Sequence, residues 1–238
     1  MTGLDKSSPR IEAMFDSLAK RYDLMNDIMT FYSHRKTREF MRMLVNAKTS
    51  KNVLDLATGT GDNIIYLKKQ LPTAKYTGID LSSKMLRIAF QKLSNKNLLE
   101  KVKLKKGNIY SIPYKDASFD LCCISYGIRN ISNIEKGFEE IYRVTKPGGV
   151  FLIVEATNPS NNLFKTINNY YFSLIVPQIA RIFSSDAEAY NYLAQSIKSF
   201  PSAKLIQKKL QKTNWNHIEY FSLIFGSVTV FRAQKTYE

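Results

Sequence analysis

Short apolar runs alternate with longer amphipathic stretches between residues 53 and 156. The runs predict β-strands, and the stretches between them predict α-helices. This alternation favours an α/β fold in which a parallel sheet is covered by helices on both faces. The predicted strands are residues 53–57, 76–80, 102–106, 119–126 and 150–156, and the predicted helices are residues 62–70, 84–93 and 134–144.

Helical segments and a hairpin are expected on either side of this core. Apolar residues at helical spacing predict helix across residues 11–45. The aromatic-rich insertion that follows the fifth strand is long enough to cover a substrate. A helix is expected at 203–213. The strands expected at 215–223 and 227–232 would form an antiparallel hairpin at the sheet edge. The expected divisions are a helical cap at 1–50, a core at 51–156, a cover at 157–200 and a closing segment at 201–238.

Two local signals mark helix ends within the core. Ser82 or Ser83 is expected to cap the start of the helix at 84–93. The sequence KPGG at 146–149 predicts a turn that closes the preceding helix before the fifth strand begins.

The sequence VLDLATGTGD at 53–62 leads from a predicted strand through two glycines into a helix. A phosphate-binding loop needs a lysine and a hydroxyl residue directly after its last glycine, whereas Gly61 is followed by aspartate and asparagine. A dinucleotide-binding fingerprint needs a small residue three positions after its second glycine, and this chain has Ile64 at that position. Asp55 and Asp62 would add negative charge beside a pyrophosphate. The motif therefore disfavours a phosphate ligand.

A cationic ligand with an adenosine and an amino-acid portion suits these residues better. Backbone amides at Gly59 and Gly61 can meet a carboxylate, while acidic side chains such as Asp55 can take an ammonium group. Asp80 ends the next strand, where a carboxylate accepts hydrogen bonds from both ribose hydroxyls. Asn108 and Ile109 follow the third strand and can frame an adenine. Together these residues predict an S-adenosylmethionine site.

Longer segments of the chain resemble the ubiquinone/menaquinone biosynthesis C-methyltransferases, the UbiE/MenG family. The resemblance is carried by FDSLAKRYDLMNDIMTFYSHR at 15–35, GIDLSSKML at 78–86, ISYGIRNISNIEKGFEEIYRVTKPGG at 124–149 and DAEAYNYLAQSIKSFP at 186–201. It implies a class I methyltransferase fold with a seven-stranded sheet whose last strand is antiparallel. It also implies cofactor contacts at Thr60, Asp80, Asn108, Ile109 and Ser125.

The same resemblance implies methyl transfer to a ring carbon of a prenylated quinol. We favour demethylmenaquinol as the acceptor, with a demethylated ubiquinone precursor, or both quinols, as the alternative. The chain departs from the family pattern at Gln195, where a glutamate is usual, and at Phe231, where a histidine is usual. These departures bear on how the acceptor is bound.

Three side chains are candidates for the catalytic step. A hydroquinone carbon becomes strongly nucleophilic when a neighbouring hydroxyl loses its proton, so the site needs a proton acceptor or a group that stabilises the phenolate. Arg129 and Asn130 lie in the loop after Ser125, and Arg129 stays charged, so it suits an oxyanion stabiliser or a residue that orients water. His34 titrates near neutral pH and is a candidate base. Two histidines and two adjacent cysteines give no metal-ligand spacing, so no metal is expected.

Charge and cysteine content bear on the remaining alternatives. The net charge of +15 fits a basic surface and raises the alternative of a nucleic-acid methyltransferase. An amino-methylating enzyme of that class would carry an Asn/Asp-Pro-Pro-aromatic run where this chain has SYGIRN, and buried Cys122 or Cys123 could not serve carbon-5 chemistry. We therefore expect no nucleic-acid partner. A non-catalytic S-adenosylmethionine-binding assembly protein is the other alternative.

The expected location is the cytoplasm. The chain begins without a basic-then-apolar signal segment, and its two adjacent cysteines cannot form a disulfide framework. A prenyl tail is insoluble in water, so we expect weak peripheral contact with the inner face of the membrane. The lysines at 204, 208 and 212 form a basic stripe on one helix that could rest on anionic lipid. A homodimer is left open.

Overall fold

The computed structural model describes residues 4–183 and 187–237. Its centre is a seven-stranded sheet with the order β3-β2-β1-β4-β5-β7-β6. Strands β1 to β5 pair in parallel, whereas β7 is antiparallel to both β5 and β6. This confirms the predicted α/β sheet with its antiparallel last strand. The strands are β1 Asn52–Leu56, β2 Lys75–Asp80, β3 Val102–Lys106, β4 Phe119–Ser125, β5 Thr145–Ala156, β6 Asn216–Leu223 and β7 Val228–Gln234.

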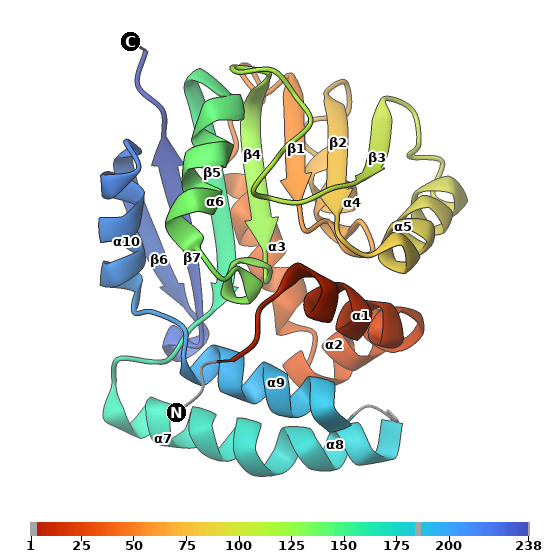
Figure 1. Cartoon of the computed structure of the whole chain (residues 1–238), viewed down its shortest axis with the longest axis vertical. Coiled ribbons are helices and arrows are strands. Elements are labelled where there is room, and N and C mark those ends of the chain that lie inside the picture. The colour runs from red at the N-terminus through yellow and green to blue at the C-terminus, as the bar shows by residue number, and fades with distance from the viewer. Residues whose placement is uncertain (1–3, 184–186, 238) are drawn as a thin grey trace.

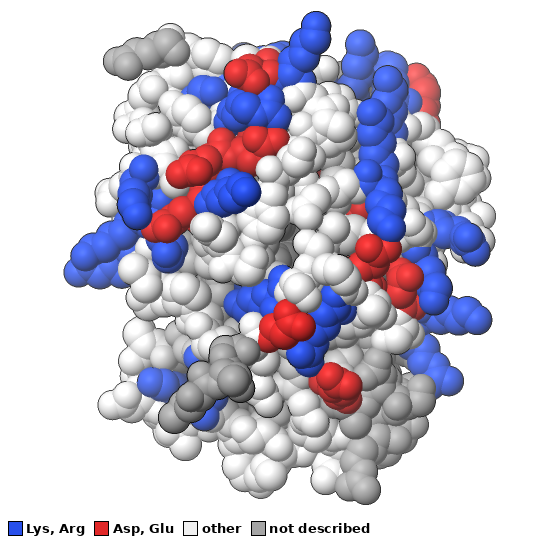
Figure 2. All heavy atoms as spheres, in the orientation of Figure 1, with Lys and Arg blue, Asp and Glu red and all other residues white. Residues whose placement is uncertain are grey.

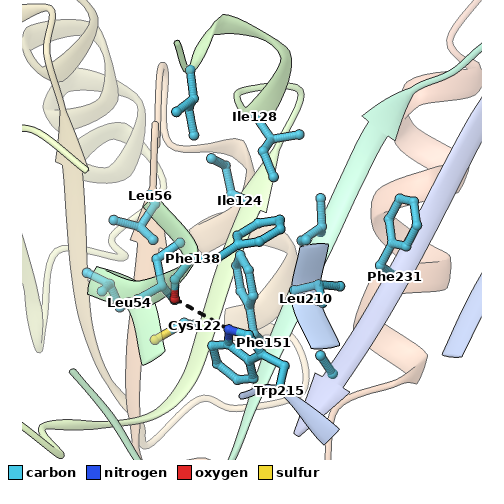
Figure 3. Packing of buried hydrophobic residues seen from close by; sticks show 14 of the residues in the cluster. Leu54, Leu56, Cys122, Ile124, Ile128, Phe138, Phe151, Leu210, Trp215 and Phe231 are labelled. Carbon is cyan, nitrogen blue, oxygen red and sulfur yellow. Dashed lines mark hydrogen bonds between the residues drawn. The ribbon is translucent and has the colours of Figure 1, made fainter. Parts of the chain in front are cut away.

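Helices cover both faces of this sheet (Figure 1). On one face, α6 and α10 pack over the aromatic side chains of Phe151 and Trp215 (Figure 3). The indole Nε1 of Trp215 donates to the Phe138 carbonyl at 3.4 Å, so this buried donor is paired. On the other face, side chains of α3, α4 and α5 pack against β1, β2 and β4. These helices are α3 Ser33–Met43, α4 Asp62–Lys68, α5 Ser83–Asn95, α6 Ile134–Val144 and α10 Ala203–Lys212.

Helix starts follow the local sequence signals. Ser82 caps α5, because its hydroxyl accepts a hydrogen bond from the backbone N–H of Met85, and this decides between the two predicted serines. Asn133 caps α6 in the same way through the N–H of Lys136.

The sheet order changes direction between β1 and β4, because β2 and β3 lie on one side of β1 and β5 lies on the far side of β4. Ligands of such sheets bind at this switch point, beyond the carboxyl ends of the strands. The remaining helices lie below these strand ends in Figure 1. They are α1 Ser8–Leu18, α2 Tyr22–Thr30, α7 Asn162–Tyr170, α8 Val176–Phe183 and α9 Ala187–Lys198.

Two sequence predictions need correction. The helix predicted across 11–45 is interrupted, because Phe31 and Tyr32 adopt left-handed conformations with φ of 45° and 60° and separate α2 from α3. The turn predicted at 146–149 lies inside β5, where the pairing with β4 shifts from Phe119↔Thr145 to Leu121↔Val150. It is therefore an irregularity of the strand, with Gly148 at a φ of 73°.

No helix in the part of the chain that the structure describes is long and apolar enough to cross a membrane.

Candidate active site

A first cavity lies at the carboxyl ends of β1, β2 and β4, and encloses about 840 Å³ of empty space, part of it open to solvent. Five of the predicted cofactor residues line it, and they come from the carboxyl ends of four strands or from the loops that follow them. Side chains of α1, with Tyr22 of α2, form the opposite wall. The predicted residues in the lining are Gly59, Asp80, Asn108, Ile109 and Ser125.

Asp80 is held in place by backbone donors. One carboxylate oxygen accepts the N–H of Gly59 and the other accepts the N–H of Ser82, both at 2.8 Å. Burial raises the pKa of Asp80 to about 6, and the two backbone hydrogen bonds only partly oppose this shift. Each oxygen retains a second lone pair for another donor, such as a hydroxyl group.

Gly59 leaves room for a ligand at this point of the cavity. Its φ is 54°, and a Cβ built on it would meet no atom closer than 4.0 Å. Because Gly59 lines the cavity, a side chain here would project into the empty space rather than into protein. The strained conformation and the open space together explain why glycine occupies the position.

Three predicted cofactor residues do not line this cavity. Asp55 is fully buried and accepts hydrogen bonds from Thr58 at 2.5 Å and from Asn63 at 2.8 Å. Thr60 is also buried, and its hydroxyl donates to Asp23 of α2 at 2.6 Å. Gly61 has a φ of 82° and sets the start of α4. These residues therefore shape the loop around Gly59 and do not form the wall.

The N-terminal helices cover the first cavity through polar contacts that sequence reasoning missed. Asn108 donates to the Ser8 hydroxyl at 3.0 Å, and the Ser82 hydroxyl donates to Asp16 at 2.5 Å. Glu12 forms an ion pair with Lys106. Such pairs join residues more than 60 positions apart, so no local pattern could reveal them.

A second cavity adjoins the first and has two wall residues in common with it, Tyr22 and Tyr126. It encloses about 1080 Å³ of empty space, part of it open to solvent. Helices α2, α3, α7 and α9 contribute to its wall, so the helical cap and the insertion meet here. Its lining includes the predicted catalytic residues Arg129 and His34. A third, smaller cavity lies between α1, α2 and α9 and is also lined by Tyr22, Arg129 and Asn130.

Arg129 forms a buried ion pair with Glu155, a residue at the end of β5. The guanidinium Nη1 is 2.8 Å from one carboxylate oxygen, and the Arg129 backbone N–H donates to the other at 3.0 Å. Glu155 is fully buried, and Arg129 also donates to the Tyr126 carbonyl. A carboxylate inside the apolar run FLIVEA is the sequence signal that could have pointed to this pair.

Two buried side-chain donors lack a hydrogen-bond partner within the described part of the chain, Arg38 Nη1 and Arg129 Nε. Both arginines line the second cavity. The other guanidinium nitrogens of Arg38 lie 3.3 Å from the Asn63 amide oxygen and 3.9 Å from Asp62. Since a buried unpaired donor is costly, these two groups fit a ligand that carries two acceptor oxygens.

His34 is neutral at physiological pH. Burial, together with the neighbouring charge of Arg38, lowers its pKa to about 4. Its Nδ1 lies 2.6 Å from the Thr30 hydroxyl, and its Nε2 lies 3.5 Å from Asp27. His34 therefore stands in the wall of the second cavity as a neutral imidazole that is a weaker base than an ordinary histidine.

Asn130 follows Arg129 in the chain, but its side chain contacts helix α9. Its side-chain oxygen accepts a hydrogen bond from the Tyr192 hydroxyl at 3.1 Å, which ties α9 to the loop after β4. Asn130 also lines the first cavity. It therefore links the insertion to the predicted cofactor side of the site.

The two cysteines are inert, as the sequence predicts. Cys122 and Cys123 are fully buried in β4, and burial raises the pKa of Cys122 to about 12. Neither thiol ionises near neutral pH. Among the described residues, no group of three or more His, Cys, Asp or Glu side chains is placed to hold a metal ion.

Comparison with known proteins places the chain in a family. The model of the ubiE/COQ5 methyltransferase family matches residues 2–235. The chain belongs to the ubiE/COQ5 methyltransferase family. Relatives match over almost the full length of both proteins. A demethylmenaquinone methyltransferase of Porphyromonas gingivalis is 34% identical, covering 99% of this chain and 98% of the relative. A ubiquinone/menaquinone biosynthesis C-methyltransferase of Hydrogenovibrio crunogenus is 32% identical, covering 98% of this chain and 92% of the relative.

Solved structures of other methyltransferases share the fold of this family member. An S-adenosylmethionine-dependent methyltransferase from Thermotoga maritima matches with a TM-score of 0.67 at 18% identity, covering 94% of this chain and 99% of that one. A phosphoethanolamine N-methyltransferase from Haemonchus contortus, solved with S-adenosylhomocysteine, also has a TM-score of 0.67, at 16% identity, and covers 94% of this chain and 60% of that one.

Proposed function

We propose that the protein transfers a methyl group from S-adenosylmethionine to a ring carbon of a prenylated quinol, with demethylmenaquinol as the acceptor. The cofactor is assigned to the first cavity. Asp80 would take the ribose hydroxyls, Asn108 and Ile109 the adenine, and Ser125 the side near the acceptor. Gly59 would let the ligand approach the backbone, while Asp55, Thr60 and Gly61 would hold the loop in shape.

The observation that carries the acceptor assignment is that Arg38 and Arg129 both line the second cavity and each has one guanidinium donor without a partner, Nη1 and Nε respectively. A quinol ring carries two oxygens on opposite sides, and each would satisfy one donor. Tyr22 and Tyr126 stand where the two cavities meet, so a ring held by the arginines would lie next to the cofactor. The names of the relatives favour the same acceptor class.

Each residue then has a distinct role in the transfer. S-adenosylmethionine, when bound, supplies a methyl group that its sulfonium has already activated. Arg129 would stabilise the negative charge that develops on the neighbouring ring oxygen, and Glu155 would hold Arg129 in position. Asn130 would fix the wall between the cavities through Tyr192. His34 is the candidate proton acceptor in this cavity, and its pKa of about 4 makes it a weak base there.

The demethylated ubiquinone precursor stays as the alternative acceptor, because some relatives are named for both pathways. Quinone analysis of a strain lacking this protein separates the two, since the accumulated precursors differ in mass. Accumulation of demethylmenaquinone alone supports the first assignment, and accumulation of neither precursor contradicts both. We also propose a cytoplasmic enzyme with peripheral membrane contact and without a nucleic-acid partner.

Asp80→Ala should lower the affinity for S-adenosylmethionine at least tenfold without unfolding the protein. The change removes a pair of charge-assisted hydrogen bonds worth roughly 1.5–3 kcal/mol each. Titration calorimetry on the purified protein measures the affinity, and a melting curve checks that the variant is folded. Unchanged affinity would remove the cofactor from this cavity.

The pH dependence of the same affinity gives a second check on Asp80. The pKa of Asp80 is about 6 without ligand, and only the ionised carboxylate can accept two ribose hydroxyls. Affinity should therefore be full above this pKa and fall by up to roughly tenfold for each pH unit below it. Asp80→Asn, which cannot ionise, should bind weakly at every pH and lose this dependence.

Arg38→Met should raise the KM for the quinol roughly tenfold and leave the affinity for S-adenosylmethionine unchanged, because a hydrogen bond to a charged donor is worth about 1.5 kcal/mol or more. If Arg38 holds the ring equally in the ground state and the transition state, kcat should change little. Arg42→Met, at a partly buried arginine one helical turn away that does not line the second cavity, serves as the control. An unchanged KM in Arg38→Met contradicts the two-arginine assignment.

A further inference from the structure

The helix formed by α7 and the π-helical segment η3 (Tyr171–Ile175), which α8 continues, carries apolar side chains on two sides. Its inner side lines the second cavity through Asn168, Tyr171 and Phe172. Its outer side carries Leu163, Ile167, Tyr170 and Leu174, and each of these side chains is at least 50% exposed. Their spacing of four, three and four residues places them along one face of the helix. We call these four residues the α7 stripe.

A helix in contact with water on its outer side normally presents polar side chains there. The α7 stripe departs from this pattern over the whole length of α7 and into η3. Isolated exposed apolar residues need no explanation, but a continuous exposed patch marks a surface that is covered by something else. In Figure 2 the lower part of the molecule, where Figure 1 places α7 and α8, is mostly white, with few charged side chains.

Four more exposed apolar side chains stand at the tips of two loops that contribute to the second cavity. Phe31 and Tyr32 separate α2 from α3, and Ile224 and Phe225 lie between β6 and β7. All four residues have positive φ values, between 45° and 60°, which bulky side chains rarely adopt. Phe31 and Ile224 line the cavity itself. Strained backbone of this kind clusters at functional sites.

Ring contacts connect these loop tips to the stripe helix. Phe225 stacks on Phe164 of α7, with ring centroids 4.7 Å apart, and Phe31 lies 6.3 Å from Tyr171 of η3. The stripe, the loop tips and the second cavity therefore belong to one continuous region of the molecule.

The charged residues near the α7 stripe indicate what kind of partner it would bind. The sequence has no acidic residue between Glu155 and Asp186, whereas Lys165 lies within α7 and is exposed. Exposed Lys36 follows the loop tip at Phe31 and Tyr32. An apolar surface whose own helix carries a lysine and no acidic residue complements an anionic lipid surface.

We propose that the α7 stripe docks on an anionic membrane surface, so that the second cavity takes up the lipid tail of the acceptor directly from the bilayer. This inference rests on the proposed function for the tail-bearing acceptor. It differs from docking through the lysines of α10, because the apolar contact and the cavity lining are both on the helix of α7 and η3. The tail would pass between the inner side of this helix and the loop tips.

Co-flotation of the full chain with vesicles tests the docking surface. Wild type should bind vesicles of equal parts phosphatidylglycerol and phosphatidylcholine, and should bind pure phosphatidylcholine and high-salt samples more weakly. Ile167→Ser combined with Leu174→Ser should lower the partition coefficient roughly tenfold, because binding scales with the apolar area that enters the interface. Neither residue lines the second cavity, so the fold and the site should stay intact.

Matched variants separate this surface from the others. Phe90→Ser combined with Leu205→Ser removes exposed apolar side chains of α5 and α10 and should leave vesicle binding unchanged. Lys204→Ala combined with Lys208→Ala should lower it less than the stripe variant does. Equal binding by wild type and the stripe variant overturns the proposal. A second result would also overturn it: wild type is a dimer, the stripe variant is a monomer, and neither binds vesicles. The stripe would then contact a second copy.

A fluorescent reporter checks which face enters the lipid. The chain has one tryptophan, Trp215, and it is fully buried, so its emission should not respond to vesicles. Tyr170→Trp should add an emission that shifts to the blue with anionic vesicles, and Phe90→Trp should add one that does not. The reverse result places another face on the membrane and overturns the proposal.

Methyl-transfer assays distinguish a failure of docking from a failure of the proposed function. The stripe variant should methylate a short-tailed quinol in solution at the wild-type rate and a long-tailed quinol in vesicles more slowly. If the stripe variant methylates both acceptors at the wild-type rate, the docking proposal is overturned and the proposed function stands. If wild type methylates neither acceptor, the function fails, while the flotation result still decides whether the stripe binds lipid.

Discussion

Arg129→Ala is expected to lower the single-turnover rate of methyl transfer by roughly 10²–10³-fold, as the loss of an oxyanion-stabilising donor does in other enzymes. Arg129→Lys should give an intermediate rate, because lysine keeps the charge but lacks the planar donor fork. The affinity for S-adenosylmethionine should barely change in either variant, since Arg129 does not line the first cavity. Rapid-quench assays with saturating cofactor measure the rate.

Melting temperatures of the same preparations separate catalysis from stability. Arg129 is buried against Glu155, so the alanine variant also leaves an unpaired carboxylate in the core and should melt at a lower temperature. The lysine variant keeps an ion-pair partner for Glu155 and should lose less. A purely structural role predicts that the activity of both variants falls only in proportion to the folded fraction. That result would remove Arg129 from the transfer step.

Glu155→Ala is expected to destabilise the protein by about 3–5 kcal/mol, because it leaves the Arg129 guanidinium buried without its counter-charge. The carboxylate also accepts the backbone N–H groups of Arg129 and Ala156, and these donors would lose their partner as well. Glu155→Gln keeps an acceptor oxygen and should cost less. Urea unfolding of the two variants and wild type, followed by fluorescence of buried Trp215, measures the free energy of unfolding.

A double variant distinguishes the loss of the pair from the loss of the side chain. Arg129→Met combined with Glu155→Leu should be more stable than Glu155→Ala, since no buried charge remains without a partner. It should still transfer methyl groups slowly, because the oxyanion donor is gone. If the double variant is as unstable as the sum of Arg129→Met and Glu155→Leu measured singly, the ion pair is not the reason for the stability of this region.

The sequence predicted those features of the fold that depend on local pattern. Ser82 caps α5, and the alternation of strands and helices specifies the parallel sheet, because caps and periodicity are properties of neighbouring residues. Asp80 could be placed because it ends a strand, and all parallel strands end at the same edge of the sheet. The interruption at Phe31 and Tyr32 could not be predicted, since neither residue favours a positive φ.

Position along the chain gave less information about where side chains point. Asp55 and Thr60 belong to the same loop motif as Gly59, yet their polar atoms bind Asn63 and Asp23 rather than line the cavity. Arg38 was missed because its unpaired donor is apparent only once α3 and α4 are side by side in space, where its other nitrogens lie near Asn63 and Asp62. Pairs of this kind join distant segments, and a single sequence carries no direct record of them.

The most direct test of the account is transfer of a deuterated methyl group from S-adenosylmethionine to demethylmenaquinol by the purified protein. Mass spectrometry of the product shows whether the label is attached to carbon or to oxygen, because a ring-methylated quinol can be oxidised to its quinone with the label retained, whereas an O-methyl ether cannot. We predict a labelled product that oxidises to the quinone, formed by wild type and far more slowly by Arg129→Ala. Label on oxygen, or no transfer by the folded protein, would contradict the account.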